Sequence, residues 1–276
     1  MKNFLLLFMI FSCSMLVSKQ STAQIDLNNL NLNDIIGKVM NVKRGFAPKF
    51  ALGNISIPKI GKVAEILGMK KNDQVNKEKY FALGRELYPA DDRWYQMELE
   101  QVDEKDKKAL FAKYEELMPK YPGKFLLTYN YAVLLFNYTY ASETKPADYR
   151  EMQKKIESVL KTTIESNKSY PEANVLMARH YYNVLYDFQD DLQAVKGTTP
   201  ADQKKKADLK TKMNEAADQL IVYSQAASDL YSAKPTLKAG ERGNYKVVNG
   251  YLSTAYEVKG DKVKADEYRK KSEANN

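Results

Sequence analysis

Hydrophobic residues recur every three or four positions along most of the chain, from about residue 76 to the C-terminus. Polar side chains fill the positions between them, which is the pattern of an amphipathic helix. No segment alternates Val, Ile and Thr with polar residues between tight turns, as a half-buried strand would. The pattern predicts an all-α fold, with helices over residues 77–88, 92–101, 104–120, 124–140, 147–167, 171–190, 200–232, 242–258 and 261–274.

Capping phrases support three of the predicted helix starts. Oxygen atoms of such side chains accept hydrogen bonds from the first-turn amides, which have no partner within the helix. The three phrases, each standing before an apolar group, are Asp103-x-x-Asp106, Ser169-x-x-Glu172 and Thr199-Pro200-x-Asp202.

One recurring sequence motif, which we call the recurring phrase, indicates how the predicted helices are arranged. Its most complete copy places Leu252 and Tyr256 one turn apart, so that both face a returning helix. Ser253 and Ala265 are small enough to let the two backbones approach each other. Gly260 suits the tight turn between the helices. The phrase therefore predicts a pair of antiparallel helices.

Two further copies of this phrase lie upstream, each with a small residue after a large apolar one. The three copies are Thr128-x-x-Tyr131-Ala132-x-x-Leu135, Asn174-x-x-Met177-Ala178-x-x-Tyr181 and Asn249-x-x-Leu252-Ser253-x-x-Tyr256. The phrase resembles the tetratricopeptide repeat (TPR), and the resemblance covers residues 104–276. The Trp of the TPR consensus is absent, and the copies are spaced more widely than the usual repeat of about 34 residues. The resemblance implies an irregular solenoid of helical hairpins, in which the first helix of each pair lines a concave face.

Residues 1–24 have the three parts of a secretory signal peptide: a positively charged start, an apolar run, and small residues at the end. The apolar run is shorter than the roughly 20 residues that span a bilayer. We expect cleavage between Ala23 and Gln24. Alternatively, Cys13 follows a segment that resembles the lipobox of bacterial lipoproteins and would become the lipidated first residue. Both alternatives predict an exported protein, in the periplasm, in the cell envelope or secreted.

The basic residues are concentrated near the N-terminus of the expected mature chain. Residues 25–75 contain five glycines and two prolines, which predict short helices joined by turns. Residues 25–71 carry a net charge of +5, out of +8 for the whole chain. We therefore expect residues 25–71 to contact an anionic surface or partner, and the nearly neutral remainder to bind no nucleic acid.

One Cys and one His restrict the catalytic chemistry that the chain can perform. Ser-His-Asp and Cys-His constellations would both need His180, which we expect to be a partly exposed helix residue with no chemical role. Asp187, Asp190 and Asp191 lack the ligand spacing of a calcium loop and are expected to be solvated. Asp91, Asp92 and Glu98 are expected to form a helix start with an exposed face. The sequence predicts no catalytic residue, no metal and no cofactor.

Binding residues are easier to predict, because the TPR resemblance implies a concave face. On the helix that carries Met177 this face would hold Val175, Arg179, Tyr182 and Asn183, and on the helix that carries Tyr131 it would hold Tyr129, Val133, Phe136 and Asn137. Tyr and Arg are frequent anchors at binding interfaces. The alternative is that these aromatic side chains pack in the core, since the chain contains 20 Tyr.

These expectations combine into three segments and one function. The segments are a signal peptide over 1–24, a basic helical segment over 25–75, and a TPR-like domain over 76–276, with the clearest repeats in 104–276. The expected function is that of a non-enzymatic adaptor or scaffold of the bacterial cell envelope, which binds a protein or peptide on its concave face. The alternative, from a different class, is an envelope module that binds a small ligand or a glycan between its helices.

Overall fold

The computed structural model of the chain describes residues 92–141 and 144–274, except for the side chain of Arg93. The signal peptide, the basic segment 25–75 and the helix expected over 77–88 lie outside the described residues. The chain divides into two compact units between Trp94 and Tyr95. The second unit, Tyr95–Asn276, contains the elements that position the candidate site.

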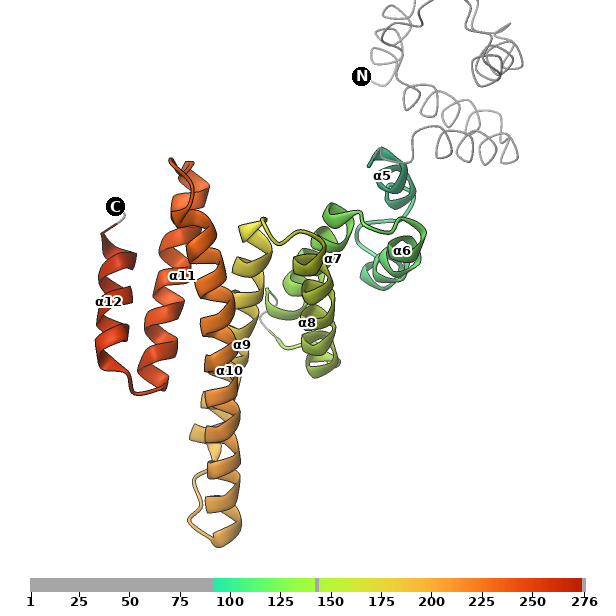
Figure 1. Ribbon diagram of the computed structural model, residues 1–276. Helices are drawn as coiled ribbons and strands as arrows, with labels where there is room; N and C mark the ends of the chain where they lie inside the picture. Colours follow the sequence, from blue (N-terminus) through green and yellow to red (C-terminus); the bar gives the residue numbers. More distant parts are fainter. Residues whose placement is uncertain (1–91, 142–143, 275–276) are drawn as a thin grey trace, which may run out of the picture. The chain divides into compact units, whose positions relative to one another are not determined.

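All regular structure in the described residues is helical, as the sequence pattern predicts (Figure 1). The eight helices of this part are α5 (Arg93–Leu99), α6 (Lys107–Lys120), α7 (Phe125–Tyr140), α8 (Tyr149–Ser166), α9 (Pro171–Ala194), α10 (Pro200–Ser232), α11 (Ala239–Val258) and α12 (Lys262–Glu273).

The capping phrase at Thr199 acts as predicted, whereas the phrase Asp103-x-x-Asp106 caps α6 through its last residue, so that α6 begins at Lys107 and not at residue 104. The Asp106 carboxylate accepts from the amide of Ala109, and Thr199 forms a capping box with Asp202. Helix α10 spans the predicted residues, 200–232. The prediction for Ser169 is wrong: α9 begins after Tyr170, which makes no capping bond, and the Ser169 hydroxyl donates to Asn167 instead.

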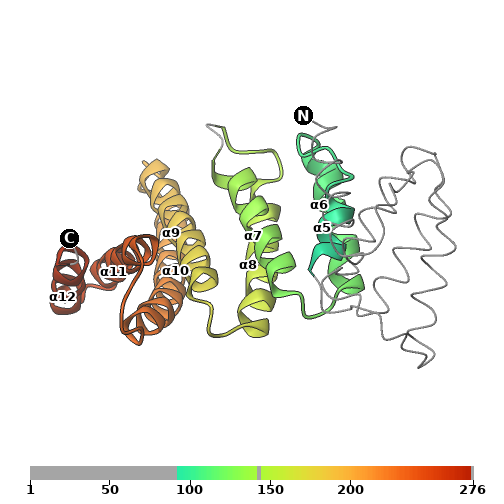
Figure 2. The same cartoon turned by 90° about the horizontal axis from the view of Figure 1, so that it is seen from above.

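Neighbouring helices pack in pairs, and the pairs stack side by side (Figure 2). Helix α7 packs on α8, α9 on α10, and α11 on α12. Helix α9 also contacts α7 and α11, which are two helices away from it in the chain. The helices α7, α9 and α11 therefore form one layer of the stack, so their side chains can contribute to a common surface.

The copies of the recurring phrase supply the centre of the core. Its large and small positions are fully or almost fully buried in each copy, at Tyr131 and Ala132, Met177 and Ala178, and Leu252 and Ser253. Burying one large apolar side chain contributes about 1.5–3 kcal/mol. The phrase therefore marks the positions that hold the hairpins together.

The α11–α12 hairpin has the turn and the close approach that its sequence predicts. Gly260 adopts a φ of 77°, a left-handed conformation that residues with a Cβ rarely adopt. The Ser253 hydroxyl donates to the carbonyl of Ala265 over 2.8 Å, so the small side chains do bring the two backbones together. Tyr256 of α11 and Tyr268 of α12 also stack across the hairpin, with ring centroids 5.6 Å apart.

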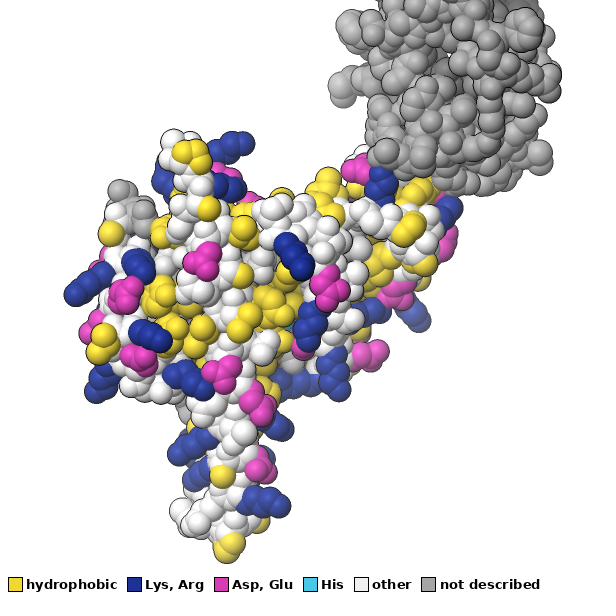
Figure 3. Space-filling view, viewed as in Figure 1, with side chains coloured by type: hydrophobic (Ala, Val, Ile, Leu, Met, Phe, Trp, Pro, Cys, Tyr) yellow, Lys and Arg dark blue, Asp and Glu magenta, His cyan; other side chains and the backbone are white. Residues whose placement is uncertain are grey.

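Helix α10 has 33 residues, and its first half extends, together with the end of α9, beyond the neighbouring hairpins (Figure 1). Figure 3 shows charged side chains of both signs along this extension, whereas hydrophobic side chains gather over the body of the stack. Lys204 and Lys205 are exposed there.

Candidate functional site

Four tyrosines and one arginine form a partly exposed surface on the layer of α7, α9 and α11. We call it the tyrosine face; it consists of Tyr129 on α7, Arg179, Tyr182 and Tyr186 on α9, and Tyr251 on α11. Tyr186 is 39% exposed, and the other four side chains are half-buried. The face spans three hairpins, so its geometry depends on how the hairpins stack.

Tyr182 is the centre of the aromatic contacts in the tyrosine face. Its ring lies 4.7 Å from that of Tyr186 and 4.5 Å from that of Tyr251, measured between ring centroids, and both pairs are tilted. Its hydroxyl donates to the Tyr186 hydroxyl over 3.3 Å. Burial, followed by the hydrogen bond to Tyr186, raises the pKa of Tyr182, so the phenol is neutral at physiological pH.

Arg179 lies between the tyrosines of the two flanking helices. Burial raises the pKa of Tyr129 to about 12, and the Arg179 guanidinium opposes part of this rise. Burial also raises the pKa of Tyr251, and Arg179 again opposes the rise. Within residues 92–141 and 144–274, no carboxylate forms an ion pair with Arg179. The guanidinium is therefore a cation among neutral aromatic rings.

Tyr129 is fixed in place by two further rings. It packs at 6.1 Å from Phe125 on its own helix and edge-on at 5.2 Å from Tyr170, measured between ring centroids. Aromatic pairs of this geometry are worth about 0.5–1.5 kcal/mol beyond the area that they bury. This edge of the tyrosine face is thus held by aromatic packing.

The structure brings together only some of the predicted binding residues. Asn183 is half-buried on α9, next in the chain to Tyr182, whereas Phe136 packs on Tyr140 at 4.8 Å between centroids. Asn137 is exposed and lines a separate cleft. The prediction that Val175 lies on the concave face is wrong. Its side chain is 4% exposed and packs in a core cluster with residues of α10 and α11.

Sequence reasoning missed Tyr251 and Tyr186. Tyr186 lies one turn after Tyr182, so helical spacing alone could have found it. Tyr251 lies between two positions of the recurring phrase, on a helix for which no face was assigned. Its role depends on the distance between α9 and α11, and no pattern within either helix encodes that distance.

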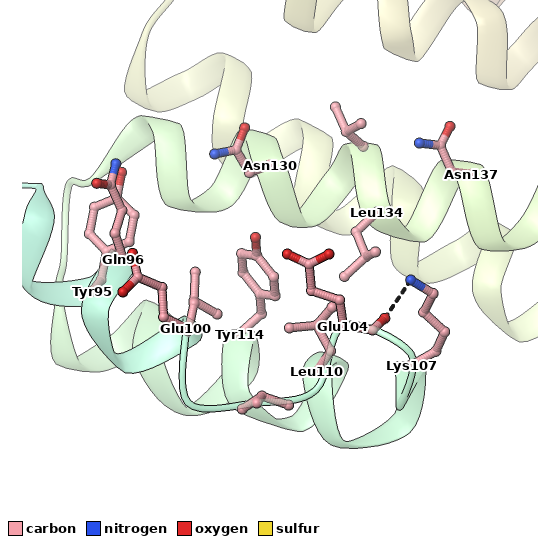
Figure 4. A pocket seen from close by; sticks show the side chains of 13 residues that line it. Tyr95, Gln96, Glu100, Glu104, Lys107, Leu110, Tyr114, Asn130, Leu134 and Asn137 are labelled. Carbon is pink, nitrogen blue, oxygen red and sulfur yellow. Dashed lines mark hydrogen bonds between the residues drawn. The ribbon is translucent and has the colours of Figure 1, made fainter. Parts of the chain in front are cut away.

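A cleft of about 670 Å³ is lined by residues of α5, α6, α7 and the segment that joins α5 to α6 (Figure 4). We call it the α5–α7 cleft. Glu100, Glu104 and Lys107 contribute its charged groups. Its remaining lining residues are Tyr95, Gln96, Leu99, Val102, Leu110, Tyr114, Asn130, Val133, Leu134 and Asn137.

His180 is buried, which corrects the expectation of a partly exposed residue. It is only 1% exposed, because its side of α9 faces α7 and α8. Its Nδ1 lies 3.0 Å from the Tyr140 hydroxyl, whose oxygen also accepts from the Gln153 amide. The Tyr140 proton is then available to Nδ1. Burial lowers the pKa of His180 to about 4, although the carboxylates of Glu157 and Asp187 oppose the shift.

Asp187 is also buried, so the expectation that it is solvated is wrong. Its Oδ2 accepts from the Tyr149 hydroxyl over 2.8 Å and from the Gln153 amide over 2.8 Å. Its Oδ1 accepts from the Lys145 ammonium over 2.6 Å, and Arg150 lies 3.4 Å from Oδ2. We call these residues, with Tyr140 and His180, the Asp187 network. Asp190 and Asp191 are exposed, as expected.

Of the remaining acidic candidates, the structure describes Asp92 and Glu98. Glu98 is 8% exposed, not on an exposed face as expected, because it accepts from the ammonium of Lys120 and the hydroxyl of Tyr121. Asp91 lies outside the described residues. Within the part of the chain that the structure describes, no group of three or more His, Cys, Asp or Glu side chains could hold a metal ion.

No protein-family model matches the chain, and no curated protein matches it. Among the helices described here, none combines the length and apolar character needed to cross a membrane.

Proposed function

We propose that the chain is an exported, TPR-like helical-hairpin solenoid that binds a protein or peptide of the bacterial cell envelope on its tyrosine face. In this proposal the chain is an adaptor or scaffold without catalytic activity of its own. The N-terminal pattern of residues 1–24 supports export, and the paired helices support the solenoid.

The TPR-like architecture is supported by equivalent positions in successive hairpins. The three copies of the recurring phrase lie on α7, α9 and α11, the first helices of their pairs, and bury the same positions. The hairpins are irregular because α10 has 33 residues and α12 only 12. Such a stack presents the side chains of its first helices on one extended surface.

The observation that carries the proposed function is the composition of the tyrosine face. Tyr and Arg are the residues most enriched among those that dominate binding energy, because they combine contact area with hydrogen bonding. Arg179 can donate to the carbonyl or carboxylate oxygens of a peptide, and the rings around it exclude water from such bonds. The exposed ring of Tyr186 adds apolar area without a charge.

Crosslinking in intact cells, followed by mass spectrometry, tests this proposal. We expect an enriched protein partner for the native chain, and its loss in the Arg179→Ala, Tyr182→Ala double variant. A matched control, Lys210→Ala with Val263→Ala, removes an exposed cation and an exposed apolar side chain elsewhere and should retain the partner. The absence of an enriched partner, or equal capture by the face variant, would contradict the proposal.

A glycan is the competing ligand, because tilted tyrosine rings such as Tyr182 and Tyr186 can also stack on sugar rings. Binding of oligosaccharides to the purified chain distinguishes the two functions. Tight binding of an oligosaccharide, abolished by Tyr182→Ala, would replace the adaptor function with glycan capture.

Export is tested at the N-terminus of the mature protein. We propose cleavage between Ala23 and Gln24, which leaves a chain without Cys; a lipidated N-terminal Cys13 is the alternative. The mass of the protein isolated from cells separates the two. We further propose that residues 25–71 dock on an anionic envelope surface, so their deletion should release the protein from the envelope fraction.

A further inference from the structure

We propose that the end of the α9–α10 extension docks on the anionic headgroups of a lipid membrane. We call this end the basic tip. It consists of residues 195–206, which are the loop after α9 and the first two turns of α10. The inference goes beyond the proposed function, because the basic tip belongs neither to the tyrosine face nor to residues 25–71.

The basic tip carries a net charge of +3. Its charged residues are Lys196, Asp202, Lys204, Lys205 and Lys206. Lys196, Lys204 and Lys205 are exposed, and no carboxylate of residues 92–141 and 144–274 forms an ion pair with them. These three ammonium groups are therefore available to an anionic partner.

Hydrogen bonds inside the basic tip use its two other charged groups. The Lys206 ammonium donates to the carbonyl of Gly197 over 2.9 Å, which ties the loop to the helix. The Asp202 carboxylate accepts from the amide and from the hydroxyl of Thr199. These bonds, and to a smaller extent the nearby Lys206 and Lys205, lower the pKa of Asp202. The basic tip is thus positive even though its one carboxylate is ionised.

Toward the body of the stack, the charges of the extension balance. Asp191 forms an ion pair with Arg150 of α8, with 3.2 Å between the guanidinium nitrogen and the carboxylate oxygen. The other charged side chains of the adjoining turns are two acidic and two basic: Asp190, Asp208, Lys210 and Lys212. The excess of positive charge therefore lies at the end of the extension, the part that a flat surface meets first (Figure 3).

The chemistry of the basic tip favours a lipid surface over a folded protein. All four of its cations are lysines, whose compact charge on a flexible stem suits mobile headgroups better than a fixed bidentate contact. A stable protein interface takes about 20–30 residues from each side, whereas the basic tip has 12. The exposed side chains of Pro200 and Ala201 add small apolar groups that can enter the headgroup region between the lysines.

Docking at the basic tip would hold the body of the stack away from the membrane. Lys204 precedes Ala216, where α10 enters the main core cluster, by 12 positions. At a rise of 1.5 Å per residue this spacing is about 18 Å. It exceeds the Debye length of about 8 Å at physiological ionic strength, so the charges of the body contribute little to the contact. The tyrosine face then stays accessible to a partner beside the membrane.

A fluorescent label on the basic tip tests this contact. The chain that begins at Gln24 contains no Cys, so Thr198→Cys creates a single site for a polarity-sensitive label. Thr162→Cys places the same label on an exposed position of α8. We expect vesicles of phosphatidylcholine and phosphatidylglycerol to shift the emission of the label at position 198 to shorter wavelength. Vesicles of phosphatidylcholine alone should leave it unchanged, and the label at position 162 should respond to neither.

The triple variant Lys196→Gln, Lys204→Gln, Lys205→Gln removes the three exposed cations of the basic tip. One lysine near an anionic bilayer strengthens binding roughly fivefold. Since residues 25–71 stay in place, we expect the lipid concentration that gives half of the emission shift at position 198 to rise at least about tenfold. The control variant Lys154→Gln, Lys262→Gln, Lys270→Gln removes three exposed lysines of α8 and α12 and should respond as the native chain does.

Several results would overturn the inference: no emission shift at position 198 with the anionic vesicles, an unchanged shift in the triple variant, or an equal loss in the control. A shift with soluble polyglutamate but none with vesicles would also overturn it, since the partner would then not be a lipid. Sedimentation of the chain with vesicles without a response at position 198 would overturn it as well, while docking of residues 25–71 would stand. A response at position 198 in a chain without any crosslinked partner would sustain the inference and remove the adaptor function.

Discussion

Helix α9 carries polar groups on two sides, and the two sides have opposite surroundings. The side with His180 and Asp187 faces α7 and α8, where the carboxylate accepts several hydrogen bonds. The side with Arg179 and Tyr182 belongs to the tyrosine face, where no carboxylate of the described residues pairs with the arginine. Buried polar groups with complete partners stabilise one packing arrangement, whereas a partly exposed cation among aromatic rings is suited to binding.

The largest expected effect comes from removing the acceptor of the Asp187 network. Asp187→Ala leaves the buried Tyr149 hydroxyl and the Gln153 amide without their acceptor, so we expect the free energy of unfolding to fall by about 3 kcal/mol. Denaturant unfolding of the variant and the native chain measures the difference. A loss below about 1 kcal/mol would show that the network does not stabilise the α7–α9 packing.

The next effect is a pH dependence that the buried His180 should produce. The pKa of His180 is lowered to about 4 by burial, so between pH 4 and 6.5 the unfolded chain binds a proton that the folded chain does not. Stability should therefore fall as the pH falls through this window, by about 2 kcal/mol between pH 7 and pH 5. Unfolding measured at both values tests this.

His180→Asn provides the control for that slope, because His180 is the single histidine of the chain. An Asn at this position keeps a polar group near the Tyr140 hydroxyl but does not titrate. The variant should lose the fall in stability between pH 7 and pH 5. If the slope persisted in the variant, another group would be responsible.

A smaller effect is expected from one hydrogen bond of the same network. Tyr149→Phe removes the hydroxyl that donates to Asp187 Oδ2 over 2.8 Å and keeps the ring. Hydrogen bonds to a charged acceptor contribute about 1.5–3 kcal/mol. We expect the lower end, about 1.5 kcal/mol, because Lys145 and Gln153 still hold the carboxylate. A value equal to that of Asp187→Ala would mean that the network fails as one unit.

The same comparison shows what the sequence could predict. Helix periodicity and the capping phrase at Thr199 predicted the helices, because both depend on residues close together in the chain. The recurring phrase predicted the buried positions, because in each hairpin the same large and small residues pack between the paired helices. Arg179 and Tyr182 were predicted as surface residues, because helical spacing separates them from the core stripe.

The roles of His180, Asp187 and Tyr251 could not be predicted in the same way. Asp187 is surrounded by partners 34–42 positions away in sequence, on α8 and the segment before it. Tyr251 contacts Tyr182 across two helices of a stack, and that contact depends on how α9 and α11 approach. Buried polar partners and the composition of the tyrosine face are properties of the stack, and periodicity within one helix carries no information on them.

The smallest effect on stability is expected where the largest effect on binding is proposed. Arg179→Ala with Tyr182→Ala removes no ion pair described in the structure, and it leaves the core positions Met177 and Tyr181 in place. We expect the free energy of unfolding to fall by less than about 1 kcal/mol, mostly from lost ring contacts with Tyr251. Thermal unfolding beside the Asp187→Ala variant measures the contrast. If the double variant were instead as unstable as Asp187→Ala, the tyrosine face would belong to the core, and a loss of partner binding in that variant would report unfolding.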